Sequence, residues 1–389
     1  DVWGKTYCGQ VSSVPQIQQI KNQYQNLNFI GRYWLCISCK ALTSYAKQTL
    51  DLFSQIITTM DFKDTKRFST LLNELIADTK STFVSEGRNL SAKWARALCS
   101  VNSTMKEILY GFSQVNTVMK YKKMKPVKIL NKFQDLYNQC RQAGGIIHVY
   151  ADEDSLKTIK PMLQPFAEEI QIRKLQPKKE LTIEMLKPYV YEYKQCDDDF
   201  AQTDIKVDSQ TGYGVLVSSN SSYFSKEISA ELVLANWLNT HSLWDKLRTT
   251  GGAYGASVTI DGISCLSVMG TYRDPSPEKS LQVYLDTLNE LQNAEFTYDD
   301  IERTIVTIYG DRICPDSPKA TALDSFERMI YANNNELMQK KLEQLLAVTP
   351  EDVKDAAKRL YENTLKMCKK VVFCQKKSKT SGKTLKLPL

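Results

Sequence analysis

The sequence predicts an α+β fold made of two units with a similar plan. The chain has 389 residues, of which 42% are hydrophobic, enough for two domains of ordinary size with two cores. It also repeats itself weakly at an offset of about 230 residues, as expected when one structural unit occurs twice. In each copy a β-rich run precedes an amphipathic helix, and a second helix start follows.

In the first copy, the predicted elements are an early strand, two helices and a late strand. The early strand covers 33–39, and the late strand covers 144–150, where a pair of glycines opens a β-rich run. Between them, one helix carries an apolar face, and a second helix opens at 60–64. The apolar face of the first helix consists of Leu50, Phe53, Ile57 and Met60.

In the second copy, three helices have clear start signals. Pro277 stands at the favoured first helical position, Thr297 and Asp300 form a capping box, and Thr349 opens a further helix. The strands are expected at 201–207, 212–218, 256–260, 263–269 and 367–373, with another helix at 225–243.

These patterns divide the chain into four parts. A linker joins the two units, because lysines and prolines interrupt the periodicity there. The last part is a solvated basic tail, and the basic end of the chain explains the net charge of +7, since eight lysines and no acid follow Leu365. The predicted parts are a first unit at 1–167, the linker at 168–192, a second unit at 193–375 and the tail at 376–389.

Composition excludes several classes of function. Because the positive charge is concentrated at the end of the chain rather than spread over a folded face, the sequence predicts no nucleic-acid partner. No apolar run approaches the ~18 residues that a membrane-spanning helix needs, so no membrane partner is predicted. The ten cysteines have irregular spacings, which indicates free thiols rather than a disulfide framework.

The first unit is predicted to lack its opening strands. Residues 6–14 resemble the strand after the glycine pair of the second unit, so the two strands and the helix before that pair have no counterpart. A sheet without them would have bare edges and an uncovered core face. Another polypeptide, or an upstream part of the same gene product, is expected to complete the unit. The chain begins without a methionine or a signal-peptide core, which indicates cleavage or truncation.

The most informative segment is 248–255, which reads Arg-Thr-Thr-Gly-Gly-Ala-Tyr-Gly. A glycine pair between a helix and a strand permits a tight backbone turn that other residues resist. Arg248 and Tyr254 flank this turn, so a guanidinium and a phenol are expected to point into one cleft. Both groups are good hydrogen-bond donors to a carbonyl oxygen or a carboxylate.

This turn resembles the arginine–tyrosine signature in the C-terminal half of pitrilysin-type zinc metallopeptidases, most closely in the presequence protease and falcilysin branch. The resemblance extends to the segments at 223–227, 243–248 and 271–275 and is sharpest from 220 to 330. The fold that it implies consists of two repeated pitrilysin-type α/β sandwich units. Each unit is a mostly antiparallel sheet with helices on one face.

The resemblance also implies an activity, a metalloendopeptidase that degrades short unstructured peptides such as cleaved targeting peptides. In the family, zinc lies in the N-terminal half, and the two halves enclose a chamber that admits the substrate. Tyr254 would donate to the substrate carbonyl and support the oxyanion. Arg248 would bind backbone carbonyls near the cleaved bond. A purely structural role, with Arg248 paired to an acid and Tyr254 in packing, is the alternative.

The residues around the glycine pair are candidates for substrate binding: Gly251, Gly252 and Ala253. Glycines let the backbone approach an extended peptide closely. The strand at 256–260 would offer an edge to which the peptide adds as a further strand. A plain turn without a binding role is the alternative.

The zinc motif of the family, an inverted His-x-x-Glu-His, does not occur in this sequence. The two histidines, His148 and His241, have no second ligand at one-turn spacing and are expected to be core or helix-end residues. This chain is therefore predicted to bind no metal and to be inactive alone. Zinc is the implied cofactor, bound by an N-terminal zinc-bearing half that acts as the partner.

Two other functions remain open. A non-catalytic scaffold or processing subunit has the same fold, although it has no need of the Arg248–Tyr254 pair. A peptide-binding protein without catalysis is also consistent, because the metal site lies outside this sequence. The resemblance implies a location in the matrix of a mitochondrion or related organelle, with a bacterial cytoplasm as the alternative.

Overall fold

The structure is a computed structural model of the chain. Most of the strand expected at 6–14 and most of the basic tail lie outside the residues that it describes. Within the described stretches, no helix is both long and apolar enough to cross a membrane. These stretches are 2–8, 33–176, 181–196, 202–314, 316–331, 333–374 and 383–387.

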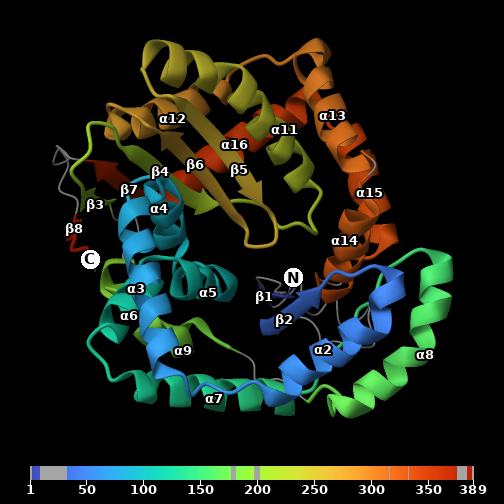
Figure 1. The fold of residues 1–389 in the computed structure, drawn as a ribbon. Coiled ribbons are helices and arrows are strands. Elements are labelled where there is room, and N and C mark those ends of the chain that lie inside the picture. The colour runs from blue at the N-terminus through green and yellow to red at the C-terminus, as the bar shows by residue number, and fades with distance from the viewer. Residues whose placement is uncertain are drawn as a thin grey trace.

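The second unit is built around a six-stranded mixed sheet with the order β5-β6-β4-β7-β3-β8 (Figure 1). The neighbours β5 and β6, β6 and β4, and β4 and β7 are antiparallel, whereas β3 is parallel to β7 and β8. β5 is therefore one edge of the sheet. The strands are β3 (Gln202–Lys206), β4 (Tyr213–Ser219), β5 (Gly255–Asp261), β6 (Leu266–Tyr272), β7 (Cys368–Cys374) and β8 (Lys383–Leu385).

The predicted strands of this unit are confirmed, with one shift. The strand expected at 263–269 begins at Leu266, because the preceding residues form the turn from β5. The Asp261 carboxylate stabilises this turn by accepting hydrogen bonds from the backbone N–H groups of Ile263 and Ser264, both at 3.0 Å.

The prediction of a solvated basic tail is wrong for residues 383–385. They form β8, which pairs with β3. Leu385 is buried, and Leu387 packs against the same core. The lysines indicated solvent, but the leucines that alternate with them give this segment an apolar side.

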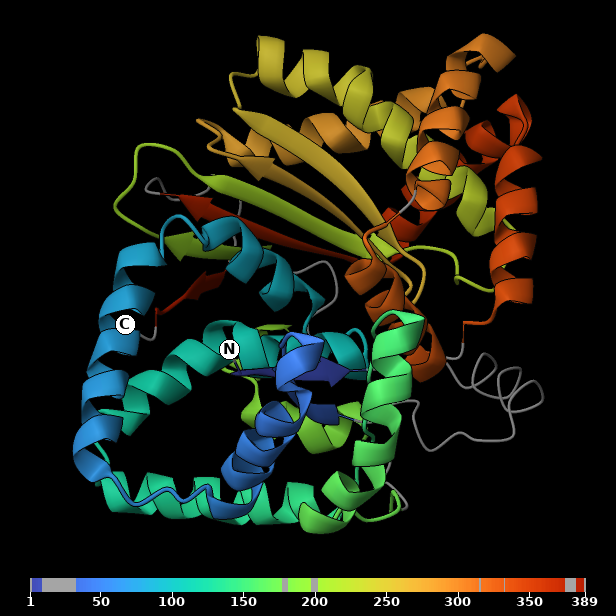
Figure 2. The same ribbon diagram turned by 45° about the vertical axis from the view of Figure 1, so that its right-hand side comes forward.

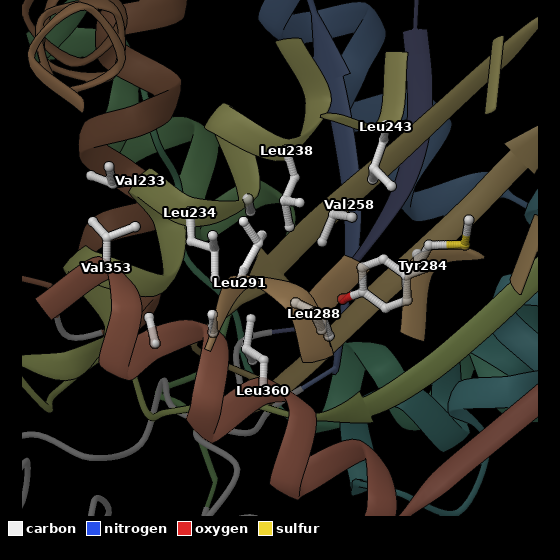
Figure 3. Close-up of a cluster of buried hydrophobic side chains, with 14 of the residues drawn as sticks. Val233, Leu234, Leu238, Leu243, Val258, Tyr284, Leu288, Leu291, Val353 and Leu360 are labelled. Atoms are coloured by element: carbon white, nitrogen blue, oxygen red, sulfur yellow. The ribbon is translucent and has the colours of Figure 1, made fainter. Parts of the chain in front are cut away.

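Three helices cover one face of the sheet. In Figure 3, Leu238, Leu288 and Leu360, one from each helix, gather near Val258 of β5. This cluster of leucine, valine and alanine side chains is the larger core of the unit. The helices are α11 (Glu227–Thr240), α12 (Pro277–Leu291) and α16 (Pro350–Lys366).

The predicted helix starts are confirmed in detail. Pro277 occupies the first turn of α12, and the capping box of Thr297 and Asp300 opens α13. Thr349 caps α16 in the same way. The remaining helices of this unit are α13 (Tyr298–Ile313), α14 (Pro318–Tyr331) and α15 (Asn335–Leu346).

The opposite face of the sheet is also covered, which differs from the expectation of helices on one face. The helix α4 (Gly87–Arg96) from the first part of the chain packs on β4, β7 and β6 (Figure 2). Successive strand residues point to opposite faces, so Leu216 lies in the core described above, while Val215 lies in a second core with Trp94. A strand that is apolar on both sides needs a cover on both sides.

The first part of the chain is mainly helical. Its strands β1 (Val2–Cys8) and β2 (Tyr33–Cys39) form a two-stranded antiparallel sheet, and β2 has the predicted bounds. Both predicted helices occur, and the second is capped by Asp64. The helices are α2 (Ala46–Thr59), α3 (Thr65–Thr82), α5 (Val101–Tyr110), α6 (Phe112–Tyr121), α7 (Pro126–Gln142) and α8 (Glu153–Glu169), with short turns at Thr43–Tyr45, Ile183–Leu186, Lys187–Tyr189 and Tyr193–Cys196.

The late strand predicted at 144–150 is wrong, since the structure has no strand there. The N–H of Gly145 donates to the carbonyl oxygen of Arg173, and the N–H of Gln176 donates to that of Ala143. These bonds secure only the start of the segment. A β-rich composition yields a strand only when a neighbouring strand offers a hydrogen-bonding ladder along its length.

Candidate functional site

The candidate site lies in the connection between α11 and β5. After α11 the chain enters a π-helical segment, η3 (Trp244–Thr250). Leu243 and Leu247 anchor it, because both side chains are buried in the larger core. Trp244 and Arg248 on the other side remain exposed. π-Helical turns are rare and frequently lie at functional sites.

The glycine pair makes the predicted tight turn after η3. The N–H of Gly252 donates to the carbonyl oxygen of Arg248 at 3.2 Å, and the N–H of Ala253 donates to that of Leu247 at 3.0 Å. Gly252 has a φ of +78°, and a Cβ on Gly251 would lie 2.7 Å from the Leu247 carbonyl oxygen. Both positions therefore favour glycine. Ala253 is buried beneath the turn, whereas the two glycines are exposed.

The turn brings Arg248 and Tyr254 together, as the sequence predicts. The guanidinium carbon of Arg248 lies 5.6 Å from the centroid of the Tyr254 ring. Tyr254 is 63% exposed, and its ring packs edge-on against Tyr272 with a centroid distance of 6.0 Å. The contacts of Arg248 in the described part of the chain are with rings rather than with acids. Its N–H donors therefore face outward, toward any ligand of the cleft.

Trp244 is a site residue that sequence reasoning missed. Its ring centroid lies 4.0 Å from the Arg248 guanidinium carbon, and the residue is 49% exposed. An aromatic residue four positions before an arginine on a helix was the available signal, since residues at that spacing lie on one face. Trp244 limits the positions that the guanidinium can adopt.

The edge of the sheet at β5 is partly occupied. Asn239 of α11 donates through Nδ2 to the carbonyl oxygen of Val258 at 3.0 Å and accepts from the N–H of Val258 at 2.6 Å. The Asn239 amide thus imitates a neighbouring strand at the middle of β5. Because outward-facing residues alternate along an antiparallel strand, Ala256 and Ile260 direct their backbone groups to the same edge. An added peptide strand would have to use these flanking positions.

The residues of this chain do not fit a catalytic zinc ion. His241 ends α11, where its ring stacks on Trp237 and its Nδ1 lies 3.2 Å from the Trp237 carbonyl oxygen. The ring of His148 stacks on Phe326 with a centroid distance of 4.7 Å. Within the described ranges, no three His, Cys, Asp or Glu side chains converge on a common point. No step through a metal is therefore derived from this chain.

Comparison with protein families identifies the fold and the turn. The family model described as "PreP C-terminal domain" matches residues 210–377, which include the whole turn. A second model, for a domain associated with subfamily C of the M16 peptidases, matches residues 2–120. The chain belongs to the presequence protease branch of the pitrilysin-type metallopeptidases. Within that family, it corresponds to the C-terminal half.

Curated relatives agree with this membership. The mitochondrial presequence protease of Candida albicans is 22% identical over 92% of this chain and 34% of its own length. An uncharacterized protein of Borreliella burgdorferi is 23% identical over 83% of this chain and 32% of its own length. The chain thus spans about a third of the length of these relatives.

Solved structures show the same fold at low sequence identity. Pitrilysin matches with a TM-score of 0.56 and 11% identity, over 88% of this chain and 35% of that chain. A peptidase M16 inactive domain from Pseudomonas fluorescens matches with a TM-score of 0.51 and 12% identity, over 88% of this chain and 78% of that chain.

Proposed function

We propose that this chain is the C-terminal half of a zinc metalloendopeptidase that degrades short unstructured peptides in a closed chamber. In this proposal, an N-terminal half supplies the zinc, and the present chain supplies substrate-binding and oxyanion-stabilising groups. The chain alone is inactive.

The observation that carries the proposal is the position of Arg248 and Tyr254 on one exposed turn. Two hydrogen-bond donors, a guanidinium and a phenol, lie beside each other at the end of an edge strand. A structural arginine–tyrosine pair would be expected to be buried or paired to an acid, whereas these side chains face solvent. This arrangement is suited to an extended peptide that presents carbonyl oxygens.

In the proposed reaction, each donor has a separate task. The Tyr254 hydroxyl donates a hydrogen bond to the carbonyl oxygen of the cleaved peptide bond, where negative charge develops. Such a donor typically contributes on the order of 10²–10³ in rate. Arg248, held against Trp244, binds a neighbouring backbone carbonyl and fixes the peptide in register. Gly251 and Gly252 present a backbone without side chains, which allows the peptide to approach.

The proposed location is the mitochondrial matrix or that of a related organelle. It is supported by relatives named mitochondrial presequence proteases. A bacterial cytoplasm is the alternative, since a bacterial protein is also similar. The proposed substrates are cleaved targeting peptides, because the relatives are named for presequences.

Denaturing mass spectrometry and metal analysis of the natively purified protein test this proposal. A second chain with an inverted zinc motif and about one zinc per complex supports it. Purification of the chain with partners that carry no such motif would favour a non-catalytic scaffold. A complex that binds unstructured peptides but leaves them intact would favour a peptide-binding protein.

A further inference from the structure

A second pocket lies at the other end of β5 from Tyr254. Its volume is about 270 Å³, and its walls come from α5, from the segment before α11, from the β5–β6 turn and from the start of α15. Residues far apart in the sequence therefore meet there (Figure 1). We call it the amide pocket, and the lining residues that matter here are Asn102, Lys106, Tyr223, Phe224, Asp261 and Asn333.

Two amide oxygens in this pocket lack a partner. Asn102 is only 7% exposed, and its Oδ1 accepts no hydrogen bond from the described residues. The Oδ1 of Asn333 is likewise buried and unpaired within the described part of the chain. Buried polar atoms in folded proteins are almost always paired with protein, water or ligand. Two unpaired acceptors in one cavity indicate a ligand that brings hydrogen-bond donors.

The aromatic wall of the pocket is held in place. The N–H of Tyr223 donates to the carbonyl oxygen of Gly262 at 2.9 Å. The Lys341 ammonium donates to the carbonyl oxygen of Ser225 at 2.6 Å and lies 5.5 Å from the Tyr223 ring centroid. The Tyr223 and Phe224 rings meet edge-on. The pocket is thus bordered by fixed apolar surfaces, which suit a side chain with apolar atoms.

The charges around the pocket disfavour a charged ligand. Lys106 lines the pocket, Arg96 lies close enough to Asp261 to interact electrostatically, and Lys341 is at its wall. These three cations outnumber the single carboxylate, whose oxygens already accept three hydrogen bonds within the β5–β6 turn. A lysine or arginine side chain would be repelled. A carboxylate would face the two unpaired amide oxygens, which is also unfavourable.

We propose that the amide pocket is a second peptide subsite, which takes one uncharged hydrogen-bond-donating residue such as glutamine or asparagine. The carboxamide donates to Asn102 and Asn333, and its methylene groups lie against Phe224. The pocket and Tyr254 are at opposite ends of β5, roughly 20 Å apart for a seven-residue strand. A peptide that reaches both sites therefore needs about six extended residues between them. This inference rests on the proposed peptide-binding function.

Binding of short blocked peptides to the full chain tests the subsite without requiring catalysis. The probes are acetylated, amidated Ala-Gln-Ala, Ala-Glu-Ala and Ala-Lys-Ala, and their affinities are measured by ligand-observed NMR. The glutamine peptide is expected to bind at least tenfold more tightly than the other two. Asn102→Leu, which keeps the volume but removes the amide, should lower its affinity at least tenfold. Arg248→Ala is the control and should leave it unchanged.

A second variant guards against misfolding of Asn102→Leu. Lys106 is exposed, so Lys106→Glu should fold normally and should shift the preference toward Ala-Lys-Ala. Equal affinities for the three peptides, or no effect of either pocket variant, would mean that the pocket holds only water. Loss of binding in Arg248→Ala would place the peptide in the cleft of the turn and overturn the subsite. If Tyr254 proves dispensable for turnover while pocket binding persists, only the peptidase proposal fails.

Discussion

The guanidinium carbon of Arg248 lies 4.0 Å from the ring centroid of Trp244, four residues earlier on the same π-helical segment. A planar guanidinium stacks well on an aromatic face and keeps its N–H donors available at its rim. The exposed cation is thus restricted before any ligand binds, which reduces the entropy lost on binding. This contact explains how a long side chain on an open surface can have a defined position.

Replacement of Trp244 should therefore weaken peptide binding through Arg248. In Trp244→Ala, kcat/KM for an unstructured peptide is expected to fall about two- to fivefold, the usual size of an exposed cation–π contact. Trp244→Phe is the matched control and should retain most of the activity, because it keeps an aromatic face. The two variants are compared in the complex with the zinc-bearing half. Equal activities would show that Trp244 does not position Arg248.

Tyr254→Phe should lower turnover far more than peptide affinity. It removes one hydroxyl, whose proposed contact forms with the developing oxyanion, so kcat should fall by about 10²–10³ while KM changes little. Since Tyr254 is 63% exposed, the melting temperature should stay the same. Steady-state kinetics and thermal unfolding provide both values. A variant with normal kcat would remove Tyr254 from the mechanism.

The glycine pair should tolerate no side chain at its first position. In Gly251→Ala, the new Cβ would lie 2.7 Å from the Leu247 carbonyl oxygen, so we expect a loss of about 1–3 kcal/mol in the free energy of unfolding. Gly255→Ala is the control, because a Cβ there has no atom within 4 Å. Its effect should stay within about 0.5 kcal/mol. Urea unfolding of the two variants measures the difference, and similar losses would contradict this account of the turn.

Local signals in the sequence were sufficient for much of the second unit. The capping box of Thr297 and Asp300 and the position of Pro277 involve residues within one helical turn, so the sequence alone defines these helix starts. The glycine pair likewise predicted a tight turn that brings Arg248 and Tyr254 together. Propensity and spacing decide such features.

Contacts between distant residues were beyond these signals. The burial of Val215 against Trp94 joins residues of different units, and the bonds of Asn239 to Val258 cross from a helix to a strand. The run at 144–150 has the composition of a strand but no ladder along its length. In each case the outcome depends on what the rest of the chain places nearby, which periodicity does not encode.

A buried acid in the first part of the chain should make stability depend on pH. Glu107 of α5 is fully buried, and its Oε1 accepts hydrogen bonds from the N–H and Oγ of Ser113 at 2.9 and 3.0 Å. Burial raises the pKa of Glu107 from 4.5 to about 7, although these bonds and the charge of Lys93 oppose the shift. The carboxyl group therefore binds its proton more tightly in the folded chain than in the unfolded chain.

The direction of the effect follows from this difference. Between pH 4.5 and about 7 the folded state holds more protons at Glu107, so its contribution to stability is full below pH 4.5 and is lost as the pH rises through about 7. The loss is on the order of 3 kcal/mol for a shift of this size. Glu107→Gln should remove this part of the pH dependence, while Glu302→Gln, at an exposed position of α13, should not. Urea unfolding at pH 5 and pH 8 compares the three proteins, and parallel pH profiles would show that Glu107 is ionised in the folded state at both pH values.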